Sequence, residues 1–145
     1  MLISEILSVK ADGQIFSIAP DQPLTEAVNK MVSHDVGSLI VIDKGVMVGL
    51  ITERDMLKTI ARRGCDFQAM KVSEVMSVEP IIGSPTDTVD YVRGVITENR
   101  ISHLVVMDAD KLLGVISFHD VAKACLSEAK LENRLLKRYI RHWPE

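Results

Sequence analysis

A seven-residue motif occurs twice in this chain, and the duplication constrains the fold more than any other feature of the sequence. Residues 49–55 read Gly-Leu-Ile-Thr-Glu-Arg-Asp, and residues 114–120 read Gly-Val-Ile-Ser-Phe-His-Asp. Each copy has a glycine, two apolar residues, a hydroxyl residue and then, three positions later, an aspartate. A repeat of this length is one supersecondary unit. The fold and the function must therefore be compatible with a pseudo-symmetric pair.

The repeat reaches well upstream of the motif. At the offset of the motif, Pro20 matches Pro85. Residues 3–8 resemble residues 72–77 at a slightly larger offset, so the first copy holds four more residues before its proline. We expect a first domain at residues 1–63, a connector at 64–71, a second domain at 72–125 and a C-terminal helical extension at 126–145.

Within each copy the spacing of apolar residues predicts a helix, a β-hairpin and a second helix. In the first copy we expect a helix over 24–32, strands at 39–42 and 46–51, and a helix over about 54–63. The second copy repeats this plan, and its last helix is expected to run over about 119–141. With a short leading strand the order is β-α-β-β-α twice. The sequence thus predicts an α/β (α+β) fold with mixed sheets covered by helices.

The composition argues against several classes of protein. The chain carries 17 Lys/Arg against 20 Asp/Glu, a net charge of −3, which argues against a general nucleic-acid binder. It has no run of about 18 apolar residues and no signal-peptide pattern, so we expect no membrane span. Cys65 and Cys125 lack metal-ligand spacing and are typical of thiols in a reducing, cytoplasmic compartment.

The repeated motif places polar side chains where a strand turns into a helix. Backbone N–H groups at a helix start are unpaired and the helix dipole is positive there, which suits phosphate oxygens. The hydroxyl can donate beside them, the aspartate can accept two ribose hydroxyls, and arginine or histidine adds counter-charge. These candidates are Thr52, Arg54 and Asp55 in the first copy and Ser117, His119 and Asp120 in the second.

A purely structural interpretation of one motif carries about equal weight. Thr or Ser is a favoured N-cap, and Asp is favoured in the first turn of a helix. Two copies with identical spacing shift the interpretation toward binding.

The motif, which follows an aspartate-bounded hairpin in each copy, resembles that of the cystathionine β-synthase (CBS) domain pair, or Bateman module. The resemblance covers about residues 1–125 and implies a tandem CBS domain pair with two pseudo-symmetric halves, one per domain. It implies an adenosine ligand, namely AMP, ADP, ATP, S-adenosylmethionine or NAD, in two clefts between the halves. It also implies a stand-alone module without an attached catalytic, channel or kinase domain.

Carried over to this chain, each of the family's clefts would combine residues of both halves. One cleft would contain Ile15, Phe16, Ile18, Gly37, Ser38 and Leu39 with Ser117, His119 and Asp120. The other would contain Ile81, Ile82, Ser102, His103 and Leu104 with Thr52, Arg54 and Asp55. Pro80 cannot donate a backbone hydrogen bond, and the second copy lacks the extra residues of the first. We therefore expect two unequal sites.

The resemblance implies a regulatory sensor whose nucleotide, foremost AMP, ADP or ATP, shifts the pose available to a partner protein. No cofactor is required and no enzyme activity is expected. The four histidines have no metal-ligand spacing, and no G-x-x-x-x-G-K-[ST] stretch occurs. The alternative is a ligand-free structural or interaction module whose basic C-terminal helix contacts a protein or nucleic-acid partner.

The C-terminal extension, residues 126–145, carries five Lys/Arg against three Asp/Glu. As a helix it separates a basic stripe, readily explained as a solvated face, from an apolar arc. The arc includes Leu135, Leu136, Tyr139, Ile140 and Trp143. Such an arc would be a costly exposed patch on a monomer, so we expect a homodimer that these helices help to pack. Contact with RNA, DNA or anionic lipid is the minority interpretation.

Overall fold

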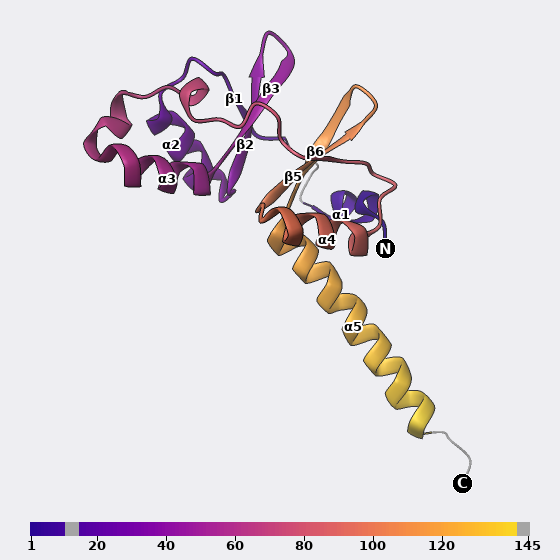
Figure 1. Cartoon of the computed structure of the whole chain (residues 1–145). Coiled ribbons are helices and arrows are strands. Elements are labelled where there is room, and N and C mark those ends of the chain that lie inside the picture. Colours follow the sequence, from indigo (N-terminus) through magenta and orange to yellow (C-terminus); the bar gives the residue numbers. More distant parts are fainter. Residues whose placement is uncertain (11–14, 142–145) are drawn as a thin grey trace. The chain divides into compact units, whose positions relative to one another are not determined.

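The computed structural model describes residues 1–10 and 15–141, and the chain divides into two compact units (Figure 1). The first-motif unit, Gln14–Ile82, contains the motif at residues 49–55. The second-motif unit consists of Met1–Gly13 together with Gly83–Glu145 and contains the motif at residues 114–120. Each motif thus lies in its own compact unit.

The first-motif unit is built on a three-stranded mixed sheet. Its strands are β1 (Ser17–Ile18), β2 (Ser38–Asp43) and β3 (Val46–Thr52). They lie in the order β1-β2-β3, with β1 parallel and β3 antiparallel to β2. The helices are α2 (Leu24–His34) and α3 (Glu53–Arg63), followed by the 3-10 helices η2 (Gly64–Ala69) and η3 (Val72–Glu74). The predicted hairpin and both predicted helices of this copy are confirmed.

The second-motif unit repeats the plan and adds a helix at each end of the chain. Its strands are β4 (Ile82–Gly83), β5 (His103–Asp108) and β6 (Lys111–Ser117), in the order β4-β5-β6, and β5 and β6 are antiparallel. Its helices are α1 (Ile3–Val9), α4 (Val89–Asn99) and α5 (Phe118–Arg141). The α/β class with mixed sheets and the extended final helix are confirmed, whereas α1 was not predicted.

The N-terminal segment packs with the second copy of the repeat. The backbone N–H of Ile3 donates to the carbonyl of Asp87 at 2.9 Å, and that of Ser4 donates to the carbonyl of Pro85 at 3.0 Å. Ile3 is fully buried. The start of the chain therefore completes the second-motif unit.

The segment after η2 makes the equivalent bonds in the first-motif unit. The backbone N–H of Val72 donates to the carbonyl of Gln22 at 2.9 Å, and that of Ser73 to the carbonyl of Pro20, also at 2.9 Å. Val72 is fully buried, as Ile3 is. The repeats in the sequence and the compact units in space therefore divide the chain at different places.

Gly49, which opens the first motif, leaves room for the segment of chain that follows η3. Leu50 and Ser77 exchange two backbone hydrogen bonds, of 3.0 and 2.9 Å, so the chain after η3 lies antiparallel to β3. A Cβ atom on Gly49 would lie 2.6 Å from the carbonyl oxygen of Ser77. The motif needs glycine here because another backbone approaches closely.

Each unit has a buried apolar core of its own. In the first-motif unit the core consists of Ile18, Leu24, Ala27, Met31, Leu39, Val41, Ile51, Met56 and Val72. In the second-motif unit the buried apolar residues are Ile3, Ile6, Val89, Val92, Ile96, Leu104, Val105, Val106, Ile116, Val121 and Ala124. Three consecutive residues are buried at Leu39–Val41 and again at Leu104–Val106, so β2 and β5 are covered on both faces, as their continuous apolar runs predict.

Candidate functional site

The first motif forms a reciprocal capping box at the start of α3. The backbone N–H of Asp55 donates to Thr52 Oγ1 at 3.2 Å, and the backbone N–H of Thr52 donates to Asp55 Oδ2 at 2.9 Å. The Thr52 hydroxyl also donates to Asp55 Oδ2, at 3.0 Å. The carboxylate is therefore fixed through Oδ2, and these bonds do not use its Oδ1 acceptor.

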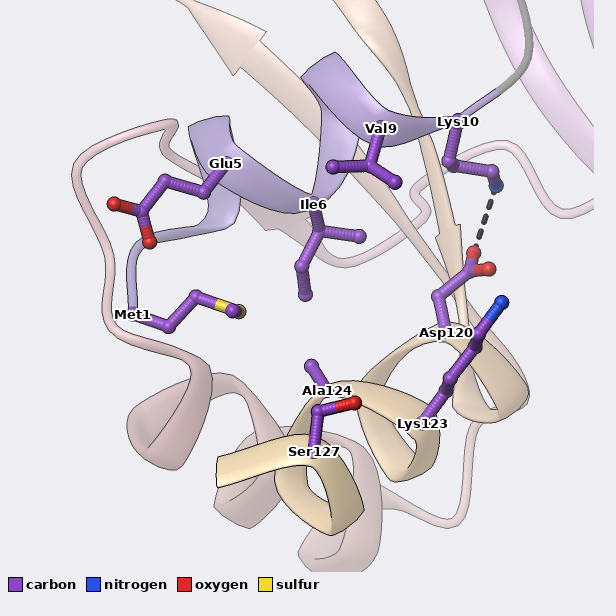
Figure 2. Close-up of a pocket in the computed structure, with 9 residues that line it drawn as sticks. All are labelled: Met1, Glu5, Ile6, Val9, Lys10, Asp120, Lys123, Ala124 and Ser127. Atoms are coloured by element: carbon purple, nitrogen blue, oxygen red, sulfur yellow. Dashed lines mark hydrogen bonds and ion pairs between the residues drawn. The ribbon is translucent and has the colours of Figure 1, made fainter. Parts of the chain in front are cut away.

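The second motif builds the same box at the start of α5 and adds a cation. The backbone N–H of Ser117 donates to Asp120 Oδ2 at 2.9 Å, and that of Asp120 donates to Ser117 Oγ at 3.1 Å. Lys10 Nζ donates to Asp120 Oδ2 at 2.7 Å and to the carbonyl oxygen of Val115 at 2.8 Å. Figure 2 shows Lys10 reaching the carboxylate from the end of α1. The N-terminal helix thus contributes directly to the site at the second motif.

The lysine alters the acidity of the second carboxylate. Burial raises the pKa of Asp120, but the hydrogen bond and charge of Lys10 and the hydrogen bonds from Ser117 act in the opposite direction. Together they hold the pKa of Asp120 below its ordinary value. Near neutral pH this carboxylate is therefore ionised.

In the first-motif unit, the structure brings the segment before β2 next to the motif. Ser38 is the cross-strand partner of Thr52, and the backbone N–H of Glu53 donates to the carbonyl oxygen of Gly37 at 2.9 Å. The sequence analysis assigned Gly37 and Ser38 to one cleft and Thr52 to the other. The two groups are neighbours across one strand pair, so β2 positions the start of α3.

The second-motif unit has the same arrangement with different chemistry. His103 is the cross-strand partner of Ser117, and the backbone N–H of Phe118 donates to the carbonyl oxygen of Ser102 at 2.8 Å. Ser102 Oγ and His103 Nδ1 form a hydrogen bond of 2.8 Å. An imidazole therefore stands beside this motif where the first unit has a serine.

The remaining candidates differ in how much of each side chain a ligand could reach. Exposed side chains belong to Ile15, Ile82, Arg54 and His119, and half-buried ones belong to Phe16 and Ile81. Side chains buried in their own unit belong to Ile18, Leu39 and Leu104, so a ligand would meet these residues through their backbone. Phe16 stacks on His34 with ring centroids 4.3 Å apart, a contact that the sequence analysis missed.

Each predicted cleft draws on residues of both compact units. The carry-over joined Ser117, His119 and Asp120 of the second-motif unit to residues 15–39 of the first-motif unit. That pairing stays a prediction, as does the reciprocal one. Each unit nevertheless builds the capping box of its motif from its own residues.

A cavity of about 390 Å³ adjoins the second motif, between α1 and α5. Its lining residues, drawn in Figure 2, are Met1, Glu5, Ile6, Val9, Lys10, Asp120, Lys123, Ala124 and Ser127. Its size lies within the range of ordinary ligand pockets. Lys10 was not predicted from the sequence: at the offset that aligns residues 3–8 with 72–77 it corresponds to Glu79, so the repeat gives no sign of a lysine beside the motif.

Within residues 1–10 and 15–141, no group of three or more His, Cys, Asp or Glu residues could hold a metal ion. No helix among these described residues is long and apolar enough to cross a membrane.

Comparison with known proteins finds a matching family, similar sequences and similar solved structures. The CBS domain family matches residues 3–62 and 72–127. The CBS domain-containing protein CBSX3, mitochondrial, of Arabidopsis thaliana is 32% identical over 146 residues, which cover 95% of this chain and 71% of that protein. The crystal structure of the CBS-domain containing protein ATU1752 from Agrobacterium tumefaciens has a TM-score of 0.81 and 30% identity, covering 85% of this chain and 92% of that one.

A more distant similarity concerns the fold alone. The CBS domain pair of protein MJ0100 is 24% identical, with a TM-score of 0.74, and the match covers 88% of this chain and 98% of that one. That domain pair was crystallised in complex with 5′-methylthioadenosine and S-adenosyl-L-methionine.

Proposed function

Since the chain belongs to the CBS-domain family, we propose that it is a regulatory module that senses an adenosine nucleotide and modulates a partner protein. The observation that carries the proposal is the capping box built twice, at the start of α3 and at the start of α5. In each box one carboxylate oxygen is bound by the motif, and these bonds leave the other as an acceptor.

The chemistry of this arrangement suits a phosphorylated nucleoside. A fixed carboxylate can accept the two hydroxyls of a ribose, and hydrogen bonds to a charged acceptor are stronger than neutral ones. The positive end of a helix lies beside it and favours phosphate oxygens. An N-cap alone would explain one such box, whereas a binding role explains why both copies keep the same spacing.

The ligand class that we propose is an adenosine compound, with AMP, ADP or ATP foremost and S-adenosylmethionine or NAD as the other members. The complex of MJ0100 with two adenosine compounds supports this class for a protein of the same fold. We place the module in the cytoplasm, where the thiols Cys65 and Cys125 would stay reduced.

One observation favours a second candidate, an interaction module that needs no ligand. Every residue of α5 from Ala129 to Ile140 is exposed, and the exposed apolar side chains include Leu131, Leu135, Leu136, Tyr139 and Ile140. The predicted Trp143 lies outside the described residues. An exposed apolar helix of this kind is suited to packing against a second copy of the chain, so we propose a homodimer under either function.

Calorimetry with AMP, ADP, ATP, S-adenosylmethionine and NAD tests the proposed function. We expect at least one compound to bind the wild-type chain. At the occupied motif, Asp55→Ala or Asp120→Ala should weaken binding by about 1.5–3 kcal/mol, because a hydrogen bond to a charged acceptor is lost.

Asp90→Ala is the matched control for these variants. Asp90 also lies in the first turn of a helix, α4, but it pairs only with the neighbouring Arg93 on an exposed surface. Its replacement should leave ligand affinity unchanged. If all five compounds fail to bind, the interaction module becomes the better explanation. If affinity is unchanged in both single variants and the double variant, the role of the aspartates is disproved.

A further inference from the structure

The cavity between α1 and α5 carries more positive charge at the second motif than the motif itself requires. Lys10 and Lys123 both line it, together with the single carboxylate of Asp120 at the same end. Figure 2 shows Lys10 bonded to Asp120, and the ammonium group of Lys123 pointing toward that end of the cavity. Two lysines and one aspartate leave a local surplus of one positive charge.

The two lysines differ in how their charges are used. Lys10 Nζ already contacts Asp120 Oδ2 and the carbonyl oxygen of Val115. Lys123 is exposed, and none of the ion pairs among the described residues includes it. The surplus charge is therefore that of Lys123, which is available to an anion entering the cavity.

The opposite end of the cavity has a net negative charge, because one ammonium group, that of Met1, lies there with the carboxylates of Glu5 and Glu128. The amino group of Met1 pairs with Glu128 at 3.1 Å, and the Glu5 carboxylate accepts the backbone N–H of Leu2 at 3.0 Å. Between the two ends, Ile6 and Ala124 supply apolar walls and are almost fully buried. An anionic group would consequently be attracted to the end that contains Asp120.

The first motif lacks one of these two cations. At the offset of the repeat Lys123 corresponds to Lys58, which conserves the charge, but Lys10 corresponds to the acidic Glu79. The surplus depends on a lysine that only the N-terminal helix α1 supplies. Any preference for an anion should therefore belong to the second motif.

We propose that Lys10 and Lys123 make the site at the second motif selective for phosphorylated adenosine ligands over uncharged ones. This inference rests on the proposed function and adds the determinant of specificity. The ribose hydroxyls would use Asp120 Oδ1, and a phosphate would lie in the cavity against the two ammonium groups. Lys10 keeps the carboxylate ionised and oriented, and Lys123 supplies the charge that the phosphate neutralises.

The ratio of AMP affinity to adenosine affinity isolates this effect. The two compounds share base and ribose, so the ratio reports the phosphate alone. Calorimetry on the full chain should show that AMP binds more tightly than adenosine. Lys10→Met and Lys123→Met should each reduce the ratio about threefold to tenfold, as expected for a charged contact that is partly exposed.

Two control variants separate charge from structure. Lys58→Met removes the equivalent lysine of the first motif and should leave the ratio unchanged. Lys10→Arg keeps the charge and should retain most of the AMP preference. Circular dichroism verifies that each variant is folded.

Several outcomes would overturn the inference. Equal losses of AMP and adenosine affinity would leave the ratio unchanged and assign the lysines a purely structural role. A loss of the ratio in Lys58→Met, with none in Lys123→Met, would place the anion at the first motif. Failure of the wild-type chain to bind either compound, or any other adenosine ligand, would overturn the proposed function together with this inference.

Discussion

The two copies of the motif have the same geometry and different surroundings. At the first motif, the Asp55 carboxylate accepts hydrogen bonds from the backbone and hydroxyl of Thr52. At the second motif, the Asp120 carboxylate also forms an ion pair with Lys10, which the chain supplies from its N-terminal helix. The position equivalent to Lys10 is Glu79. The two copies thus share the local capping box. Their charges differ because Lys10 packs beside the second motif, whereas its equivalent in the first-motif unit is Glu79.

The largest expected effect tests which unit each leading segment completes. Residues 3–8 pack in the second-motif unit, and residues 72–77 pack in the first-motif unit. Ile3 is fully buried in the second-motif unit, and Val72 is fully buried at the equivalent place in the first-motif unit. Ile3→Ala should cost about 2–5 kcal/mol, because it leaves a cavity in a closed core. Amide hydrogen exchange should show the loss of protection in β5 and β6, although Ile3 belongs to the first copy in the sequence.

Val72→Ala is the reciprocal variant and should instead reduce protection in β2 and β3. If Ile3→Ala exposed residues 17–52 as strongly as residues 103–117, the division into two independent units would be wrong.

A substitution at the first motif's glycine has a smaller effect and sharpens the comparison. A Cβ atom on Gly49 would lie 2.6 Å from the backbone oxygen of Ser77, which cannot rotate away. Gly49→Ala should therefore destabilise the first-motif unit by about 1–3 kcal/mol, the usual cost of overpacking. Urea unfolding followed by circular dichroism measures the loss.

Gly94→Ala is the control for a methyl group added in open space. Gly94 lies in α4, and apart from its chain neighbours and the backbone of its own helix no atom lies within 4 Å of the Cβ position. Alanine is the better helix former, so this change should be neutral or stabilising by about 0.5–1 kcal/mol. If the Gly49→Ala chain were as stable as the Gly94→Ala chain, the segment after η3 would not lie in close contact with β3 at Gly49.

The ion pair of Lys10 should give the smallest effect and a characteristic pH dependence. The pKa of Asp120 lies below its ordinary value, so its ionised form contributes stability above the unfolded pKa, about 3.9. That contribution is lost as the pH falls through the lower folded pKa. Lys10→Met should raise the pKa of Asp120 and cost about 0.5–1 kcal/mol near pH 7, a figure kept small because Lys10 is partly exposed.

The deficit of Lys10→Met should shrink as the pH falls below about 4, where the carboxylate becomes protonated in both chains. Carboxyl NMR titration reads the pKa of Asp120 directly, and urea unfolding at each pH reads the stability. Glu79→Met is the control at the equivalent position and should change stability by less than about 0.5 kcal/mol. If Lys10→Met lowered the free energy of unfolding by the same amount from pH 7 to pH 2.5, Lys10 would stabilise the fold through its hydrogen bond to the carbonyl oxygen of Val115 and not through Asp120.

Local patterns in the sequence predicted much of the fold. Apolar runs gave β2, β3, β5 and β6, and helical spacing gave α2 to α5, because each pattern is set by residues close together in the chain. The capping boxes were also predictable, since Thr52 with Asp55 and Ser117 with Asp120 have the spacing of a helix start.

The partner of each leading segment could not be predicted in this way. Residues 3–8 and 72–77 resemble each other, so either segment matches the local requirements of either motif strand. The choice depends on bonds such as that from Ile3 to Asp87, which join distant parts of the chain. For the same reason Lys10 was missed, because only the docking of α1 brings it to Asp120.

The position of α1 has a consequence for the order in which the nascent chain can fold. The first-motif unit is continuous, so it can close once residue 82 has left the ribosome. Helix α1 is synthesised before the rest of its unit, yet its partners in β6 and α5 emerge only after about a hundred more residues. At a synthesis rate of roughly 5–20 residues per second, it waits on the order of ten seconds with Ile3 and Ile6 uncovered. Helix α1 thus reaches its place later than the helices of the first-motif unit that follow it in the chain, and its apolar side chains stay exposed throughout that interval.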